Sequence, residues 1–102
     1  FLALATKYLV SDLKGKYIHL GMIEPLFNSL KNEFEITKIG QSVKKNSIYQ
    51  VKIGSGKTKV LIWSQMHGNE PTTTKGLFDF LNFASMLLQS LSAAGCSTCR
   101  KC

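Results

Sequence analysis

Two side chains that can bind a metal ion stand three positions apart in the middle of the chain, within His67-Gly68-Asn69-Glu70. A neutral imidazole and a carboxylate are both good zinc ligands, and a catalytic zinc typically takes three protein ligands and keeps one position for water. The spacing alone is common, and it also suits a surface histidine followed by a glutamate that favours the dipole at a helix N-terminus. His67 and Glu70 are therefore candidate zinc ligands, two members of a set that needs a third.

The elements on either side would hold this pair at the end of a strand. Val60–Trp63 is a continuous apolar run, which predicts a strand covered on both faces at the centre of an α/β sheet, with Trp63 in the core. Pro71 suits a helix start and favours an extended Glu70, so we expect a helix from about Thr72. Sites in open α/β sheets form outside the carboxyl ends of the strands, which is where this motif falls.

The residues upstream of the motif predict one helix and two strands. Residues 22–32 carry apolar side chains at helical spacing, with Pro25 in the first turn. Residues 34–39 and 48–53 alternate as strands do, and residues 54–57 predict a hairpin turn into the apolar run. The second helix should present a wide apolar surface of Leu77, Phe78, Phe80, Leu81, Phe83, Ala84, Leu87 and Leu88. The predicted fold class is α/β, a mixed sheet of about three strands with flanking helices.

The motif and the order of these elements together resemble the opening of a zinc carboxypeptidase of the carboxypeptidase A superfamily, with its phosphorylase/hydrolase-like fold. The residues that carry the resemblance are Ile39–Ser42, Ile53–Lys57 and Val60–Thr74. The resemblance implies that residues 16–84 are the N-terminal part of a carboxypeptidase domain, and that His67 and Glu70 are its first two zinc ligands. Such an enzyme uses zinc to polarise the scissile carbonyl and a glutamate to activate water as it removes C-terminal residues from peptides.

The same resemblance implies that several parts of the active site are missing. The family's third zinc ligand, a histidine, comes later in the chain, as do its general-base glutamate and its substrate-binding arginines, and nothing here matches them. His19 lies upstream of the motif and is expected at a helix entry, and Arg100 does not match. We therefore expect a truncated domain with an incomplete zinc site, no catalytic residue and no hydrolysis by itself. The peptide substrate would belong to the full-length parent.

Two other functions stay open. The spelling His-Gly-Asn-Glu also occurs in a branch of zinc deacylases similar to succinylglutamate desuccinylase and aspartoacylase, which cleave an acyl group from an amino acid. Gln65-Met66 and residues 71–74 favour the peptidase branch. The third hypothesis is a non-catalytic small α/β domain that kept the fold and binds a partner or nothing.

Composition and charge exclude several classes of partner. The chain is 44% hydrophobic and 19% charged, which is typical of a globular protein. Its net charge is +7, but its basic residues are scattered lysines apart from Arg100, and the arginine forks that favour nucleic acid are absent. No apolar run reaches the ~18 residues of a membrane span. The first residues lack a signal peptide's basic leader, and the body lacks cysteine, which favours the cytoplasm.

Two further patterns are predicted to have no function. Gly54–Thr58 is reminiscent of a phosphate loop, but Val51 replaces the required glycine and no helix follows, so we reject nucleotide binding. Residues 85–102 form a serine-rich tail that ends with Cys96, Cys99 and Cys102. These cysteines have cluster-like spacing without a fourth ligand, and we expect the tail to lie outside the fold.

Overall fold

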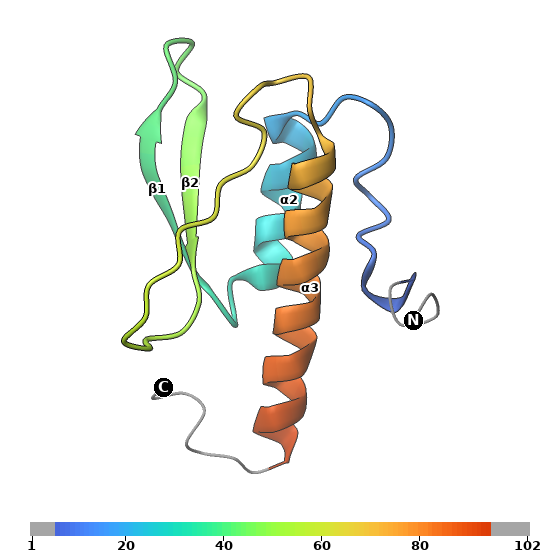
Figure 1. Cartoon of the computed structure of the whole chain (residues 1–102), viewed down its shortest axis with the longest axis vertical. Coiled ribbons are helices and arrows are strands. Elements are labelled where there is room, and N and C mark those ends of the chain that lie inside the picture. The colour runs from blue at the N-terminus through green and yellow to red at the C-terminus, as the bar shows by residue number, and fades with distance from the viewer. Residues whose placement is uncertain (1–5, 95–102) are drawn as a thin grey trace.

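The structure of the chain is a computed structural model that describes residues 6–94. Its elements, in chain order, are α2 (Leu20–Leu30), β1 (Glu35–Gln41), β2 (Ser47–Lys52) and α3 (Thr72–Ala93). Figure 1 shows the hairpin of β1 and β2 on one side of the two helices and residues 9–19 on the other. Helices together with a two-stranded antiparallel sheet confirm the α/β class, in a small and incomplete form.

The core lies where the two helices and the sheet meet. Helix α2 buries Phe27 and Leu30 of its predicted apolar face, and α3 buries Phe78 and Leu81, which are only part of its predicted apolar surface. The ring of Phe27 lies 5.8 Å from that of Phe78 and 4.9 Å from that of Tyr49 on β2, measured between centroids. Phe27 therefore ties three elements together. The other buried apolar residues are Leu13, Ile18 and Phe34.

Helix α2 begins earlier than the apolar spacing predicted. Its first residue is Leu20, so Pro25 lies in the second turn rather than the first. A proline there lacks the N–H that would bond to the carbonyl of Gly21, and the helix continues to Leu30 without that bond. His19 occupies the N-cap position and is exposed, which confirms it as a helix-entry residue.

The hairpin agrees with the alternating pattern of its sequence. β1 and β2 pair antiparallel, with Ile36 opposite Val51 and Lys38 opposite Tyr49. Tyr49 and Val51 pack against the core, whereas Gln50 and Lys52 are exposed. This two-residue period places one face of the sheet on the helices and the other in water.

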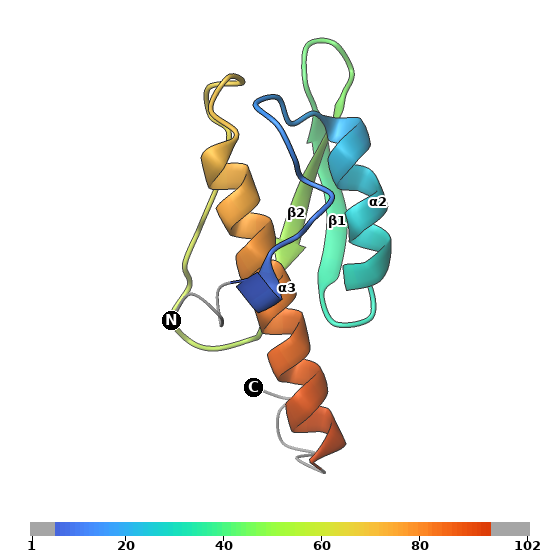
Figure 2. The same cartoon turned by 90° about the vertical axis from the view of Figure 1, so that its right-hand side faces the viewer.

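Residues 60–63 do not form the predicted third strand. The sheet of residues 6–94 holds β1 and β2 alone, and residues 60–63 run as a drawn-out chain on the side of α3 away from α2 (Figure 2). Trp63 is 62% exposed, so its predicted place in the core is wrong, and residues 54–57 do not join two paired strands. A central strand needs a neighbour on each edge and a layer on each face, and the described chain supplies neither.

The apolar side chains of this region are exposed to solvent. Val60, Leu61 and Ile62 are 77%, 76% and 60% exposed. The predicted apolar surface of α3 is also only partly covered, because Phe80 and Phe83 face solvent. Exposed apolar surface of this extent favours association or aggregation.

Helix α3 begins at Thr72, as predicted, and continues without a break to Ala93. Ser85 on this helix is buried. The helix therefore extends past residue 85, while the division into a domain of residues 16–84 and a tail stays a prediction. No helix within residues 6–94 combines the length and apolarity needed to cross a bilayer.

One hydrogen bond between α2 and the sheet should be visible in a pH titration. The phenol of Tyr49 donates to Glu24 Oε1 at 2.7 Å, and this bond raises the pKa of Tyr49 above its ordinary value of 10.0. A phenol pKa raised in the folded state stabilises the fold below pH 10, and that contribution is lost as the pH rises through the folded-state pKa. Glu24→Gln should lower the Tyr49 pKa in an absorbance titration of the tyrosines. Glu35→Gln on β1 is the control, and an equal shift in both variants would contradict the assignment.

Candidate metal-binding half-site

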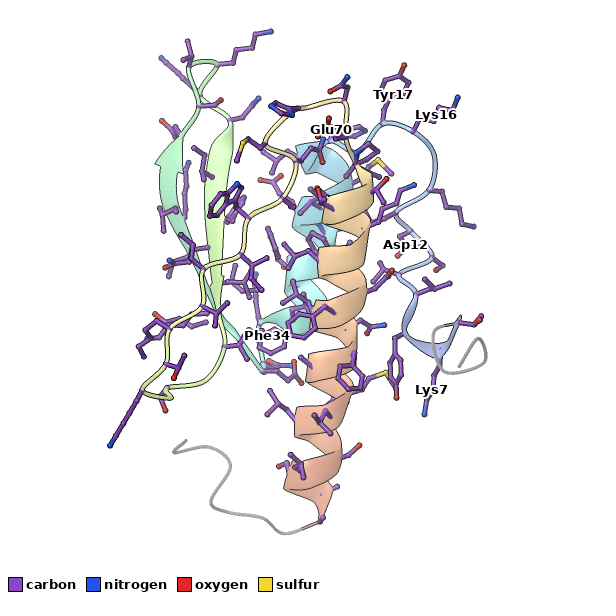
Figure 3. The ribbon with its side chains drawn as sticks, viewed as in Figure 1. Lys7, Asp12, Lys16, Tyr17, Phe34 and Glu70 are labelled. Atoms are coloured by element: carbon purple, nitrogen blue, oxygen red, sulfur yellow. The ribbon has the colours of Figure 1, made fainter. Side chains whose placement is uncertain are left out.

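His67 and Glu70 lie in the loop that leads into α3. The N–H of Glu70 donates to the carbonyl of His67 at 3.1 Å, which closes a turn across the motif. Glu70 lies at the N-terminal end of α3, at the same end of the molecule as Tyr17 (Figure 3). Because the turn reverses the chain, the two side chains face each other, with His67 Nδ1 3.2 Å from Glu70 Oε2.

This separation fits a shared metal ion. Two ligand atoms that are each about 2.0–2.2 Å from a tetrahedral zinc lie about 3.4 Å apart. His67 Nδ1 and Glu70 Oε2 lie within hydrogen-bond distance of each other in this structure, and their 3.2 Å separation is close to that value. Both side chains are about two-thirds exposed, at 68% and 64%, so a metal ion can reach them from solvent. The pair therefore suits zinc as two members of a ligand set.

Gln65 holds the loop in shape from one side of the motif. Its side-chain amide donates to the carbonyl of Ile18 at 2.8 Å and to that of Gly68 at 3.0 Å, while its backbone N–H donates to Thr73 Oγ1 at 3.2 Å. Gln65 adopts φ of +52°, a left-handed conformation that is uncommon for a residue with a Cβ. Its hydrogen bonds compensate for this unfavourable backbone and tie the motif to the chain that enters α2.

Thr74 anchors Gln65 to α3. The Thr74 side chain is 2% exposed, and its hydroxyl donates to Gln65 Oε1 at 2.8 Å and lies 3.1 Å from Ser64 Oγ. Because Thr74 is fixed on the first turn of α3, it transmits the position of the helix to the loop. The contacts from Thr74 through Gln65 to Gly68 place the turn that carries His67.

The described part of the chain brings no third ligand to this pair. Within residues 6–94, no group of three or more histidine, cysteine, aspartate or glutamate side chains could hold a metal ion. His19 remains at the start of α2 and does not join such a group. Arg100 and the predicted cysteine cluster of Cys96, Cys99 and Cys102 lie outside the described residues.

Sequence reasoning found the two candidate ligands but missed the residues that position them. In the sequence, Gln65 and Thr74 stand out only as residues that flank the motif. A threonine at the third residue of a helix gives no sign that its hydroxyl will accept or donate a long-range bond. The positive φ of Gln65 has no sequence signal either, because glycine or asparagine is the usual residue there.

The comparison with protein families agrees with the motif. The family model described as zinc carboxypeptidase matches residues 22–90, which include both candidate ligands, both strands and most of α2 and α3. Neither the search of curated proteins nor the search of solved structures returned a match.

Proposed function

The chain belongs to the zinc carboxypeptidase family, and we propose that it forms the N-terminal part of a carboxypeptidase domain that supplies two zinc ligands, His67 and Glu70. The observation that supports this proposal is the 3.2 Å approach of His67 Nδ1 to Glu70 Oε2 within a turn that other residues hold in place. The family match is the reason for proposing peptides, cleaved at their C-terminal residue, as the substrate class.

The two side chains would have different parts in holding the metal. His67 offers a neutral nitrogen, and Glu70 offers an anionic oxygen that offsets part of the metal's charge. Bound zinc supplies a Lewis acid that polarises the carbonyl of the bond to be cleaved. Gln65 and Thr74 hold the backbone of the turn at Gly68, so that the turn need not be ordered when the metal binds.

Peptide cleavage needs more than these two side chains. Within residues 6–94, no third metal-binding side chain joins the pair. A catalytic zinc typically has three protein ligands, and a positioned base must activate water. We therefore expect the polypeptide of residues 1–102 to bind zinc weakly and to leave peptides intact. Zinc-dependent release of C-terminal amino acids that disappears in His67→Ala would contradict this expectation.

Zinc binding can be measured directly by calorimetry, without reference to turnover. The three cysteines, Cys96, Cys99 and Cys102, should first be replaced by serine, because thiolates bind zinc strongly and would mask the half-site. In that background we expect one weak site. His67→Ala and Glu70→Ala should each weaken it by at least about tenfold, since each removes one of two ligands.

A matched histidine provides the control for this experiment. His19 is the other histidine of the chain, it is exposed, and it lies at the N-cap of α2. His19→Ala should leave the zinc affinity unchanged. Equal weakening in His19→Ala and His67→Ala would mean that zinc binds histidines without a formed site, and the proposal would then be wrong.

A further inference from the structure

Residues 8–18 form a strap that runs beside α3 in the opposite direction, on the side away from the hairpin (Figure 1). Asn82 of α3 donates to the carbonyl of Tyr8 at 3.0 Å, and Asp79 Oδ1 accepts the N–H of Val10 at 2.8 Å. In both bonds the helix supplies the side chain and the strap supplies the backbone. These bonds hold the first part of the strap at a fixed place on the helix.

The second part of the strap leads to the candidate metal site. Lys75 donates to the carbonyl of Gly15, and the side-chain amide of Gln65 donates to that of Ile18 at 2.8 Å. The same amide donates to the carbonyl of Gly68, inside the turn that carries the metal-binding pair. Gln65 therefore joins the end of the strap to that turn.

The strap is also part of the hydrophobic core. Leu13 and Ile18 are each 5% exposed and belong to the same buried cluster as the inner side chains of α2 and α3. The family match begins at residue 22, so it assigns no role to the strap. Its connection to the metal-binding pair comes from the contacts of this chain.

A bend at Gly15 sets the path between the two parts of the strap. Gly15 adopts φ of +86°, in the left-handed region that glycine enters without penalty and a residue with a Cβ avoids. The carbonyl of Gly15 accepts from Lys75, and three residues later the carbonyl of Ile18 accepts from Gln65. A change confined to this bend should therefore be felt at the Ile18 carbonyl.

We propose that the strap is a positioning element for the pair of His67 and Glu70. It holds the Ile18 carbonyl where the Gln65 amide can bond to it and to Gly68 at once, and so keeps the turn in the shape that binds zinc. The strap supplies no ligand and acts through Gln65. This inference rests on the proposed function, because it requires the pair to bind zinc.

Gly15→Ala tests the strap without changing the site. Gly15 is exposed and an added Cβ meets no atom within 4 Å, so the variant should fold and bear only backbone strain. The strain is released when the strap leaves α3, which makes the open state about 5- to 30-fold more populated. The amides of Leu13, Gln65 and Glu70 are all hydrogen-bonded, and we expect their hydrogen exchange, followed by NMR, to accelerate by about this factor. Gly56→Ala, at an exposed glycine with open space and no positive φ, should leave these rates unchanged.

Zinc should in turn slow hydrogen exchange in the strap, because a metal ion that binds only while the strap lies on α3 stabilises that state. At a zinc concentration about ten times the dissociation constant, the amides of Leu13 and Glu70 should exchange about tenfold more slowly in the cysteine-free background. His67→Ala should abolish this protection at both amides. The amide of Ser42, which donates to the carbonyl of Asn46 in the hairpin turn at 2.8 Å, is the control and should not respond to zinc.

The strap and the proposed function can fail separately in these measurements. Zinc protection of the Glu70 amide without protection of the Leu13 amide would overturn the role of the strap and leave the metal-binding pair intact. Unchanged exchange at Glu70 in Gly15→Ala would do the same. Zinc that protects neither amide, or that still protects both in His67→Ala, would overturn the proposed function and this inference with it.

Discussion

Phe78→Ala is expected to remove most of the free energy that keeps the chain folded. Phe78 is 5% exposed and packs against the Phe27 ring, which in turn contacts Tyr49 of β2. Removing a buried phenylalanine side chain typically costs about 3–5 kcal/mol, because apolar burial is lost and a cavity remains. Native domains have a net stability of only about 5–15 kcal/mol, and a domain this small belongs at the lower end.

Urea titration followed by circular dichroism at 222 nm measures this loss. Phe80→Ala is the matched control, because Phe80 lies on the same helix two positions away and is 49% exposed. We expect this second substitution to change the free energy of unfolding by less than about 1 kcal/mol. Similar losses in the two variants would show that the core does not lie where Phe27 and Phe78 meet.

The local elements of the fold could be predicted because their signals are local. Thr72 starts α3 where Pro71 ends the extended loop, and the alternation of Tyr49 and Val51 identifies the buried face of β2. These patterns depend on neighbours a few residues away along the chain. The sequence did not predict that α2 begins at Leu20, because a proline is expected in the first turn of a helix. A proline in a later turn destabilises the helix but does not prevent it from forming.

Strand formation at residues 60–63 could not be decided by the same signals. Continuous apolarity at Val60–Trp63 expresses a preference for burial between two layers, but it does not supply those layers. Strand pairing also needs hydrogen-bonding partners that are distant in sequence. Since residues 6–94 form only one hairpin, Trp63 is exposed despite its apolar neighbours.

In the candidate site, too, the local features could be predicted from the sequence and the contacts between distant residues could not. Residue type and spacing were enough to select His67 and Glu70 as candidate ligands, and the turn across the motif brings their side chains together. The hydrogen bonds of Gln65 connect the loop to Ile18, just before α2, and to Thr74 in α3. Contacts over such separations depend on the final packing, so the sequence carries no direct sign of them.

Thr74→Val should loosen the loop that carries His67 while leaving the helices intact. The substitution preserves shape but removes the hydroxyl that donates to Gln65 Oε1, which leaves a part-buried amide oxygen without that partner. Leaving such a group unsatisfied costs about 1–3 kcal/mol. If this cost appears in the opening of the loop, the loop amides should exchange hydrogen about 5- to 150-fold faster. Amides of residues 65–70 should exchange faster, and zinc affinity in the cysteine-free background should fall.

Thr72→Val provides the control, because Thr72 is an exposed threonine in the same turn of α3. It should change neither exchange in the loop nor zinc affinity. Equal effects at positions 72 and 74 would mean that helix propensity, rather than the buried hydroxyl, governs the loop.

Gln65→Gly separates the side chain's role from the backbone strain at the same position. Glycine adopts φ of +52° without the penalty that a Cβ brings, so the backbone conformation itself becomes easier. The substitution also removes the amide that bonds to Ile18 and Gly68. If the amide positions His67, Gln65→Gly weakens zinc binding as Thr74→Val does. Zinc binding equal to that of the unchanged protein would show that the turn alone, closed by His67 and Glu70, is sufficient.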